Sequence, residues 1–162
     1  MALGDIEALY DGNGFGPNGT IRYAVAASAT LIYPGEPVAK ALGGAAVTPA
    51  ATNTPVVATD FYAGIAASTS TNTASADGVV DVWPVDSKTT WLISPKVPAT
   101  FNAQSEYDAL VGDRVLLDLT TGSYTILAAD GATYGCVIAP MDVTLHPGKV
   151  AFQFRNGVNF LT

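Results

Sequence analysis

Charged residues are scarce in this sequence: they make up 13% of it, whereas hydrophobic residues make up 49%. Globular domains typically have about 25% charged residues. Only seven residues are basic and fourteen are acidic, which gives a formal net charge of -7 at pH 7. Nucleic-acid-binding domains carry clustered Lys and Arg on one face, but the basic residues here stand singly along the sequence. We therefore expect no nucleic-acid partner.

Cysteine and histidine each occur once, as Cys136 and His146. A lone cysteine forms no internal disulfide, and the apolar neighbours of Cys136 predict a small buried side chain. A zinc site needs three or four His, Cys or carboxylate ligands. A hydrolase-type serine triad needs a G-x-S-x-G turn, which the sequence lacks. We predict no metal, no cofactor and no catalytic residue, and hence a protein that is not an enzyme.

Two further patterns were compared with known kinds of site. Residues 11–16 begin like an EF-hand loop, but Phe15 and Arg22 stand where such a loop needs ligands. Asp81 with Asp86, and Asp113 with Asp118, are candidates for a carboxylate pair, as in glycoside hydrolysis. Residues five apart in a strand point to opposite faces, so neither pair converges locally. We favour a mobile arm and solvated carboxylates as the interpretation of these patterns.

Long apolar runs are also absent. No run approaches the roughly 20 residues of a transmembrane helix, and the first residues lack the basic and apolar regions of a signal peptide. We therefore expect no membrane association, and synthesis in a host cytoplasm.

Helix signals are few, and turn residues divide the sequence into many short segments. One helical turn is expected at 6–10 and another at 102–110, where Asn102 is a candidate N-cap. The rest predicts short strands separated by Gly, Pro, Asn and Asp. We predict an all-β fold, a compact β-barrel or sandwich. The expected strands are at 20–26, 29–33, 37–41, 56–59, 63–67, 79–85, 90–94, 113–119, 124–128, 135–139 and 149–155.

Two segments stand apart from these strands. Residues 1–19 end in a Gly-rich stretch and predict a flexible, extended N-terminal arm ahead of a β domain at 20–162. The run at 68–77 has only small and polar residues and predicts an exposed loop. Trp83 precedes Pro84, which marks an edge strand or a strand end and places Trp83 near a partner. The predicted partner-contact residues are Leu3, Ile6, Leu9, Tyr10, Phe15 and Trp83.

The sequence also contains a weak internal repeat. Gly35-Glu36-Pro37-Val38 resembles Gly112-Asp113-Arg114-Val115, at an offset of 77 (35 to 112). The strands that follow differ by offsets of 72 (62 to 134) and 70 (78 to 148). Either the pattern arises by chance in a chain rich in Gly and Ala, or one β unit is used twice, in pseudo-repeat halves at 20–94 and 105–162.

A family resemblance rests on three segments of the first half: Tyr33-Pro34-Gly35-Glu36-Pro37-Val38, Ala63-Gly64-Ile65-Ala66-Ala67-Ser68 and Asp77-Gly78-Val79-Val80-Asp81-Val82. They resemble the G-x-x-V, G-I-A and G-x-V-x-V strands of the capsid decoration (cement) proteins of tailed phages. The resemblance implies a structural protein on the outer capsid surface of a virion, which binds the major capsid protein lattice and stabilises it. It also implies a β-barrel or β-tulip-like fold, a homo-oligomer with a trimer favoured, and no catalytic residues.

The aromatic residues leave an alternative open. Large aromatic side chains are usually core in a small β domain, which is the interpretation that we favour for most of them. Exposed aromatic residues would instead stack on sugars or on a protein partner. The alternative function is therefore a carbohydrate-binding β module of a fibre or spike protein. The aromatic residues in question are Trp83, Trp91, Phe101, Tyr107 and Tyr124.

Overall fold

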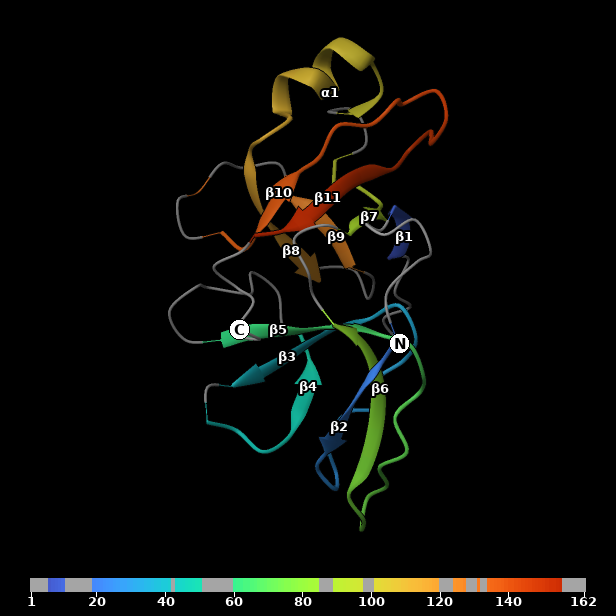
Figure 1. Ribbon diagram of the computed structural model, residues 1–162, viewed down its shortest axis with the longest axis vertical. Helices are drawn as coiled ribbons and strands as arrows, with labels where there is room; N and C mark the ends of the chain where they lie inside the picture. Colours follow the sequence, from blue (N-terminus) through green and yellow to red (C-terminus); the bar gives the residue numbers. More distant parts are fainter. Residues whose placement is uncertain are drawn as a thin grey trace.

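The computed structural model describes residues 6–10, 19–41, 43–50, 60–84, 89–97, 101–119, 124–127, 131 and 134–155. Its strands form two antiparallel sheets, accompanied by one short helix, which confirms the predicted all-β fold. Five strands make up the lower sheet in Figure 1: β2 (Ile21–Val25), β3 (Pro37–Ala41), β4 (Val47–Pro49), β5 (Asp60–Ala66) and β6 (Gly78–Pro84). The upper part contains β1 (Glu7–Tyr10), β7 (Thr90–Ile93), α1 (Gln104–Leu110), β8 (Arg114–Leu119), β9 (Tyr124–Leu127), β10 (Cys136–Ile138) and β11 (Val150–Phe154).

The two sheets have the same strand order. The five-stranded sheet runs β2-β6-β5-β3-β4, and the six-stranded sheet runs β1-β7-β11-β10-β8-β9. Without β1, the second order is the first with every strand number raised by five. We call β2–β6 the first unit and β7–β11 the second unit. β7 pairs with β11 and so belongs to the second unit, although the halves expected from the sequence placed residues 90–94 in the first.

Equivalent backbone hydrogen bonds reinforce this correspondence. A glycine lies two residues before β3 and another lies two residues before β8. Both adopt a positive φ, 82° at Gly35 and 94° at Gly112, so a sharp turn precedes each of the two strands. The bonds that follow recur at the offsets of 77, 72 and 70 found in the sequence. The bond from Gly35 N–H to Ala66 O (2.8 Å) corresponds to the bond from Gly112 N–H to Ile138 O (2.9 Å). The bond from Ala66 N–H to Glu36 O (2.8 Å) corresponds to the bond from Ile138 N–H to Asp113 O (3.0 Å). The bond from Ala67 N–H to Asp81 O (2.8 Å) corresponds to the bond from Ala139 N–H to Ala151 O (2.9 Å).

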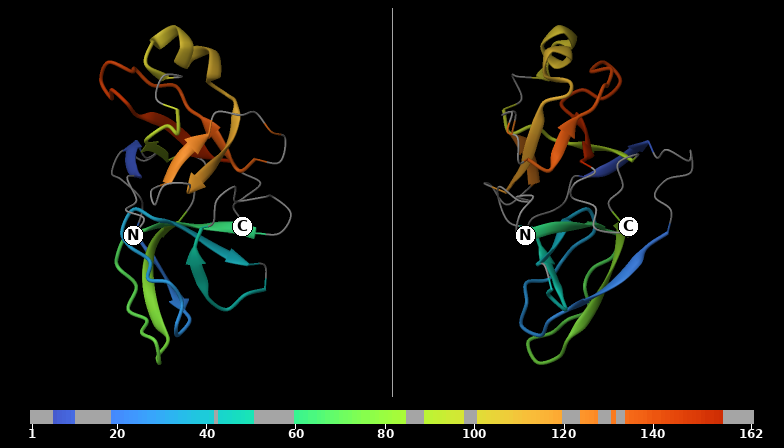
Figure 2. Two further views of the ribbon diagram at one scale, coloured as in Figure 1. Left: turned by 180° about the vertical axis from the view of Figure 1, so that it is seen from behind. Right: turned by 60° about the vertical axis from the view of Figure 1, so that its left-hand side comes forward.

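Each unit curls so that its outer strands approach each other (Figure 2). In the first unit β2 comes near β4, and the sheet forms a half-barrel. In the second unit the chain after β7 makes a parallel bridge between Pro95 and Ile126 of β9. Two hydrogen bonds hold this bridge, from Lys96 N–H to Ile126 O (2.9 Å) and from Ile126 N–H to Ser94 O (3.2 Å).

One hydrophobic core crosses the junction between the units. Tyr62 and Ile65 of β5 are buried together with the aromatic and aliphatic side chains of the second unit. The Tyr62 ring meets Phe154 edge-on, with 5.1 Å between centroids. The Tyr124 hydroxyl donates to Ala50 O across the same junction (2.7 Å). A smaller second core lies within the first unit and includes Val25, Ile32, Val38, Val47, Ala63, Ala66, Val80 and Val82.

The N-terminal segment contributes a strand where one helical turn was expected. β1 pairs antiparallel with β7, with Ala8 opposite Trp91, and Ile6 is buried in the main core. Four residues hold an extended conformation here because the edge of β7 offers them hydrogen-bond partners. The expectation of a helical turn at 6–10 is therefore wrong, and these residues belong to the six-stranded sheet.

The second expected helix is present as α1, but its start differs from the prediction. The N-cap residue is Ala103, which makes no side-chain capping bond, so Asn102 does not cap the helix. Gln104 holds this end of the helix instead. Its side chain donates to Met141 O (3.0 Å) and accepts from Val143 N–H (3.0 Å), which ties α1 to the segment before β11.

Candidate functional site

Most of the aromatic residues that were candidates for stacking are in the core. Trp91, Phe101, Tyr107 and Tyr124 are all buried. Trp83 is half-buried and lies 6.4 Å from Trp91, measured between ring centroids. It lies at the end of β6, as Pro84 predicted, but β6 is an inner strand between β2 and β5. The tryptophans therefore do not form an exposed platform.

The predicted contact residues of the N-terminal segment are only partly described. Ile6 is buried in the core, so it would reach a partner only if β1 left the sheet. Leu9 and Tyr10 lie in β1, and their side chains are outside the described part of the chain. Leu3 and Phe15 also lie outside the described residues. The contact roles of these residues stay predictions.

A different surface is built at the lower end of the first unit, which we call the tip and define as residues 26–31 and 68–77. A turn in residues 26–29 is held to the second segment by hydrogen bonds, three of which are donated by Ser28 and Ala27. Ser28, at a φ of 61°, donates from its N–H to Thr73 O (2.9 Å) and from its hydroxyl to Ala74 O (2.6 Å). Ala27 N–H donates to the Asp77 carboxylate (2.7 Å). The two segments thus form one ordered surface.

Buried polar side chains anchor the tip from below. Ser70 and Asn72 are 5% and 6% exposed, whereas residues 69, 71 and 73–77 are exposed, as expected for the run at 68–77. The Ser70 hydroxyl accepts from Ile32 N–H (3.0 Å) and donates to the Asn72 amide oxygen (2.7 Å). The Asn72 amide nitrogen donates to Ala29 O (2.8 Å). Because each of these buried polar groups has a hydrogen-bond partner, the small polar residues hold the backbone of the tip in one conformation.

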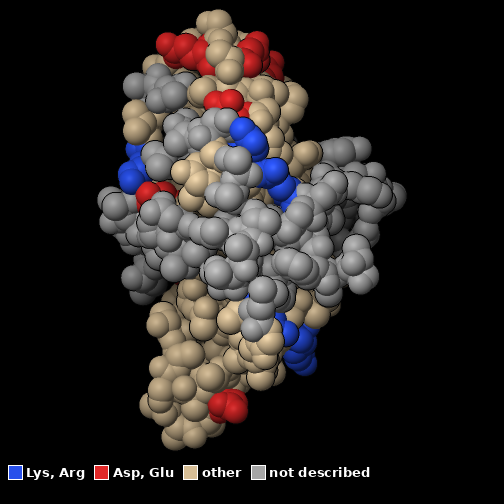
Figure 3. All heavy atoms as spheres, turned by 90° about the vertical axis from the view of Figure 1, so that its left-hand side faces the viewer, with Lys and Arg blue, Asp and Glu red and all other residues tan. Residues whose placement is uncertain are grey.

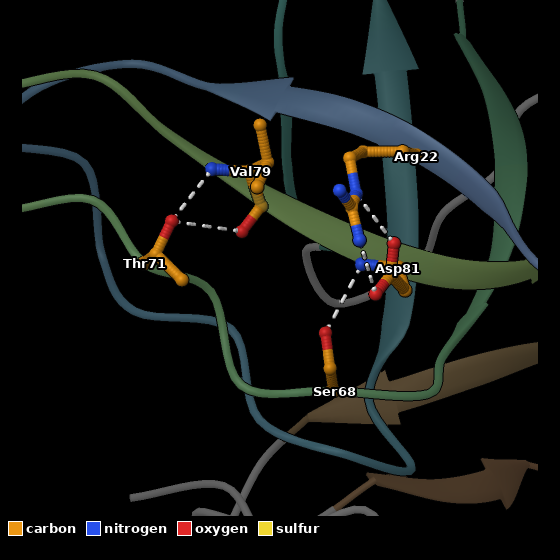
Figure 4. Close-up of polar contacts among 5 residues, drawn as sticks. All are labelled: Arg22, Ser68, Thr71, Val79 and Asp81. Carbon is orange, nitrogen blue, oxygen red and sulfur yellow. Dashed lines mark hydrogen bonds and ion pairs between the residues drawn. The ribbon is translucent and has the colours of Figure 1, made fainter.

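The tip continues onto the outer face of β6 (Figure 4). The Thr71 hydroxyl accepts from Val79 N–H (3.0 Å), and the Ser68 hydroxyl accepts from Asp81 N–H (3.1 Å). Arg22 of β2 reaches the Asp81 carboxylate, with 2.8 Å between Nε and Oδ1 and 3.1 Å between Nη2 and Oδ2. The hydrogen bond with Arg22 lowers the pKa of Asp81, and the same bond raises the pKa of Arg22. The two charges neutralise each other at the surface.

The other charged side chains described between residues 19 and 84 are also engaged within the first unit. Glu36 is 3% exposed and accepts from Tyr33 N–H (2.9 Å), and burial raises its pKa. The Lys40 ammonium lies 5.8 Å from the centroid of the Tyr23 ring. Together with Asp77 and the Arg22–Asp81 pair, these contacts leave the first unit with little unpaired charge on its surface.

Apolar side chains are exposed on this neutral surface. Leu31 at the tip is 39% exposed and Val79 beside it is 38% exposed. The opposite end of the molecule is acidic, because Glu106, Asp108 and Asp142 are exposed on and near α1. Figure 3 shows acidic side chains gathered at that end, whereas the lower end is mostly uncharged on the same face. The molecule therefore has a neutral end and an acidic end.

The described residues offer little for catalysis. No group of three or more His, Cys, Asp or Glu side chains in the described ranges is placed to hold a metal ion. Cys136 is fully buried, and burial raises the pKa of its thiol, so the reactive thiolate is disfavoured. An open hollow of about 630 Å³ lies between α1 and residues 140–144. The carboxylates at its rim, Asp108 and Asp142, bond to their own neighbours Gln104 and Thr144.

Within the described part of the chain, no helix is long and apolar enough to span a bilayer.

Comparisons with known proteins find no matching family model, no similar curated protein and no similar solved structure.

Proposed function

We propose that the protein is a capsid decoration protein, which binds the outer face of a viral major capsid protein lattice and stabilises the shell. The observation that carries the proposal is the neutral tip, where the backbone is fixed by hydrogen bonds and Leu31 and Val79 are exposed. A surface of this kind loses little conformational entropy when it is buried against a partner. The tip has one charged side chain, the exposed carboxylate of Asp77, which accepts a hydrogen bond from Ala27 N–H, so little charge needs desolvation. The proposed location is the outer surface of the virion.

The direction of binding follows from the two ends of the molecule. Placing the tip against the lattice buries the neutral surface and leaves the acidic α1 end toward solvent. Binding of this type stabilises an assembled shell by mass action, because the lattice offers the composite site only when capsomers are joined. The family resemblance of residues 33–82 also favours this function, and these residues make up most of the first unit.

The alternative of a carbohydrate-binding module has less support. It expects exposed tryptophans on one face, but Trp91 is 0% exposed and Trp83 is half-buried against it. We therefore retain protein binding as the proposed activity.

The test is binding to purified, expanded and undecorated shells of the virus that encodes the protein, followed by pelleting and counting copies per shell. We expect saturable binding with a stoichiometry that matches the lattice. Leu31→Asp should weaken it at least tenfold, because the variant loses the apolar contact of the exposed 39% of Leu31 and also places an unpaired carboxylate in the buried contact. The matched control is Leu145→Asp, since Leu145 is 71% exposed but lies in the second unit. It should bind as the wild type does.

Deletion of residues 1–19 is a poor test, because it removes β1 and uncovers β7. Absence of saturable binding by the wild-type protein would overturn the proposed function. Equal weakening by the two Asp variants would refute the assignment of the tip as the binding surface.

A further inference from the structure

The two units differ at the outer edge of their first strand. In the second unit β1 pairs with this edge of β7. In the first unit no described strand pairs with the outer edge of β2. The register makes the comparison residue by residue: Ile21 pairs with Val82, and Trp91 pairs with Phe152, an offset of 70 in both strands (21 to 91 and 82 to 152).

The equivalent positions also differ in exposure. Trp91 and Leu92 belong to the main core and are 0% and 4% exposed. Their equivalents in the first unit are Ile21, which is 38% exposed, and Arg22, whose side chain is 67% exposed. The edge at residues 20–22 therefore has the form of a strand-pairing site that no described strand occupies.

We propose that this edge is a contact between two copies of the protein, in which the β2 strands pair antiparallel about a two-fold axis at Ile21. Edge strands present unpaired N–H and C=O groups to a neighbouring chain, and a two-fold contact uses the same patch on both copies. β1 pairs with β7 in the antiparallel sense over a similarly short stretch, so the equivalent edge of β2 suits the same geometry. The contact joins the two five-stranded sheets into one.

Charge selects the position of the axis. With the axis at Ile21, that side chain faces Ile21 of the second copy, and each Arg22 faces Thr20 of the other. With the axis at Arg22, two like charges would lie directly opposite each other, which destabilises a strand pair. Each Arg22 is also neutralised by Asp81 of its own chain. The edge is thus apolar at its centre and neutral at its sides, in a chain whose net charge of -7 otherwise opposes self-association.

This contact does not depend on capsid binding, because it involves only residues of this chain. It predicts a dimer, whereas the family resemblance favours a trimer. It also lies away from Leu31, so failure of the shell-binding test would leave it standing.

The first experiment is sedimentation equilibrium of the wild-type protein over a micromolar to millimolar range. We expect a reversible dimer. Ile21→Asp and Ile21→Lys should each weaken dimerisation at least tenfold, because like charges then face each other across the axis. A one-to-one mixture of the two variants should form a heterodimer, since opposite charges then meet. A monomeric wild type, a trimer, or a mixture that stays monomeric would overturn the proposal, once circular dichroism has shown that both variants are folded.

Cross-linking gives a test that does not need a charged side chain. Residues directly opposite in an antiparallel pair have Cβ atoms about 4.5–5.5 Å apart, close to the range that a disulfide needs. Ile21→Cys should therefore form a covalent dimer under mild oxidation. Val79→Cys is the matched control, because Val79 is equally exposed at 38% but lies on the inner strand β6. The native Cys136 is buried and does not compete. Equal cross-linking of both variants would refute the two-fold contact at Ile21.

Discussion

Replacing Tyr107 with Phe tests how α1 is fixed to the second unit. The Tyr107 ring is 0% exposed, and its hydroxyl donates to Ala139 O (2.8 Å) and accepts from Ala151 N–H (3.0 Å). Phe keeps the ring but leaves both backbone groups without the hydroxyl. An unsatisfied buried donor or acceptor costs about 1–3 kcal/mol, so the two together should lower the free energy of unfolding by about 2–6 kcal/mol.

The repeated fold supplies a matched comparison for this variant. Asp81 N–H, which is equivalent to Ala151 N–H, donates to the Ser68 hydroxyl (3.1 Å). Ser68 is only half-buried, so water can replace its hydroxyl, and Ser68→Ala should cost about 1 kcal/mol or less. Urea denaturation followed by circular dichroism measures both changes. In thermal unfolding, 1 kcal/mol corresponds to about 2–4 °C for a protein of this size. A Tyr107→Phe protein as stable as wild type would refute the reasoning.

Three further predictions concern pH, a glycine and the cysteine. Burial raises the pKa of Tyr107 to about 12, so the stability linked to this group is intact below pH 10 and falls between pH 10 and 12. When the free energy of unfolding is measured against pH, it should fall less steeply over this range in Tyr107→Phe than in the wild type. Gly64→Ala should lower the free energy of unfolding by more than 2 kcal/mol, because Gly64 has a φ of 153° and a Cβ there would overlap the Trp83 carbonyl oxygen. Gly112→Ala is the comparison: Gly112 has a φ of 94° and open space around it, so the loss in the same denaturation assay should be about 1–2 kcal/mol. Cys136 should react with a thiol reagent only as fast as the protein unfolds, because its side chain is buried and burial raises its pKa, and fast labelling of the native protein would contradict this.

Local signals in the sequence were sufficient for much of the fold. Gly35 and Gly112 mark the turns that launch β3 and β8, and the offset of 77 between them recurs in the hydrogen bonds. A strand was expected at 149–155, and Val150, Phe152 and Phe154, which alternate there, lie in the core of β11. Ala151, between them in the sequence, is buried as well, and its N–H donates to the Tyr107 hydroxyl. That second layer depends on a helix far away in sequence, so periodicity alone could not predict it.

The candidate site was harder to predict for the same physical reason. Ser70 and Asn72 look like loop residues, and they are buried because Ile32 and Ala29, about 40 residues earlier, supply their partners. Similarly, β1 is a strand only because β7 offers it an edge. The aromatic residues were easier, since large apolar side chains are usually buried. Pro84 marks either an edge strand or a strand end, and Trp83 lies at the end of the inner strand β6.

The core shared by the two units has a consequence for synthesis on the ribosome. Residues 19–84 emerge first, but Tyr62 and Ile65 pack against side chains of β7–β11, which are made later. β1 likewise waits for β7, about 80 residues downstream. The nascent first unit must therefore keep an apolar face uncovered until most of the chain has been translated. Such long-range pairing slows folding and prolongs the exposure of aggregation-prone apolar surface. Growth temperature and translation rate should therefore govern how much of the protein reaches its soluble form.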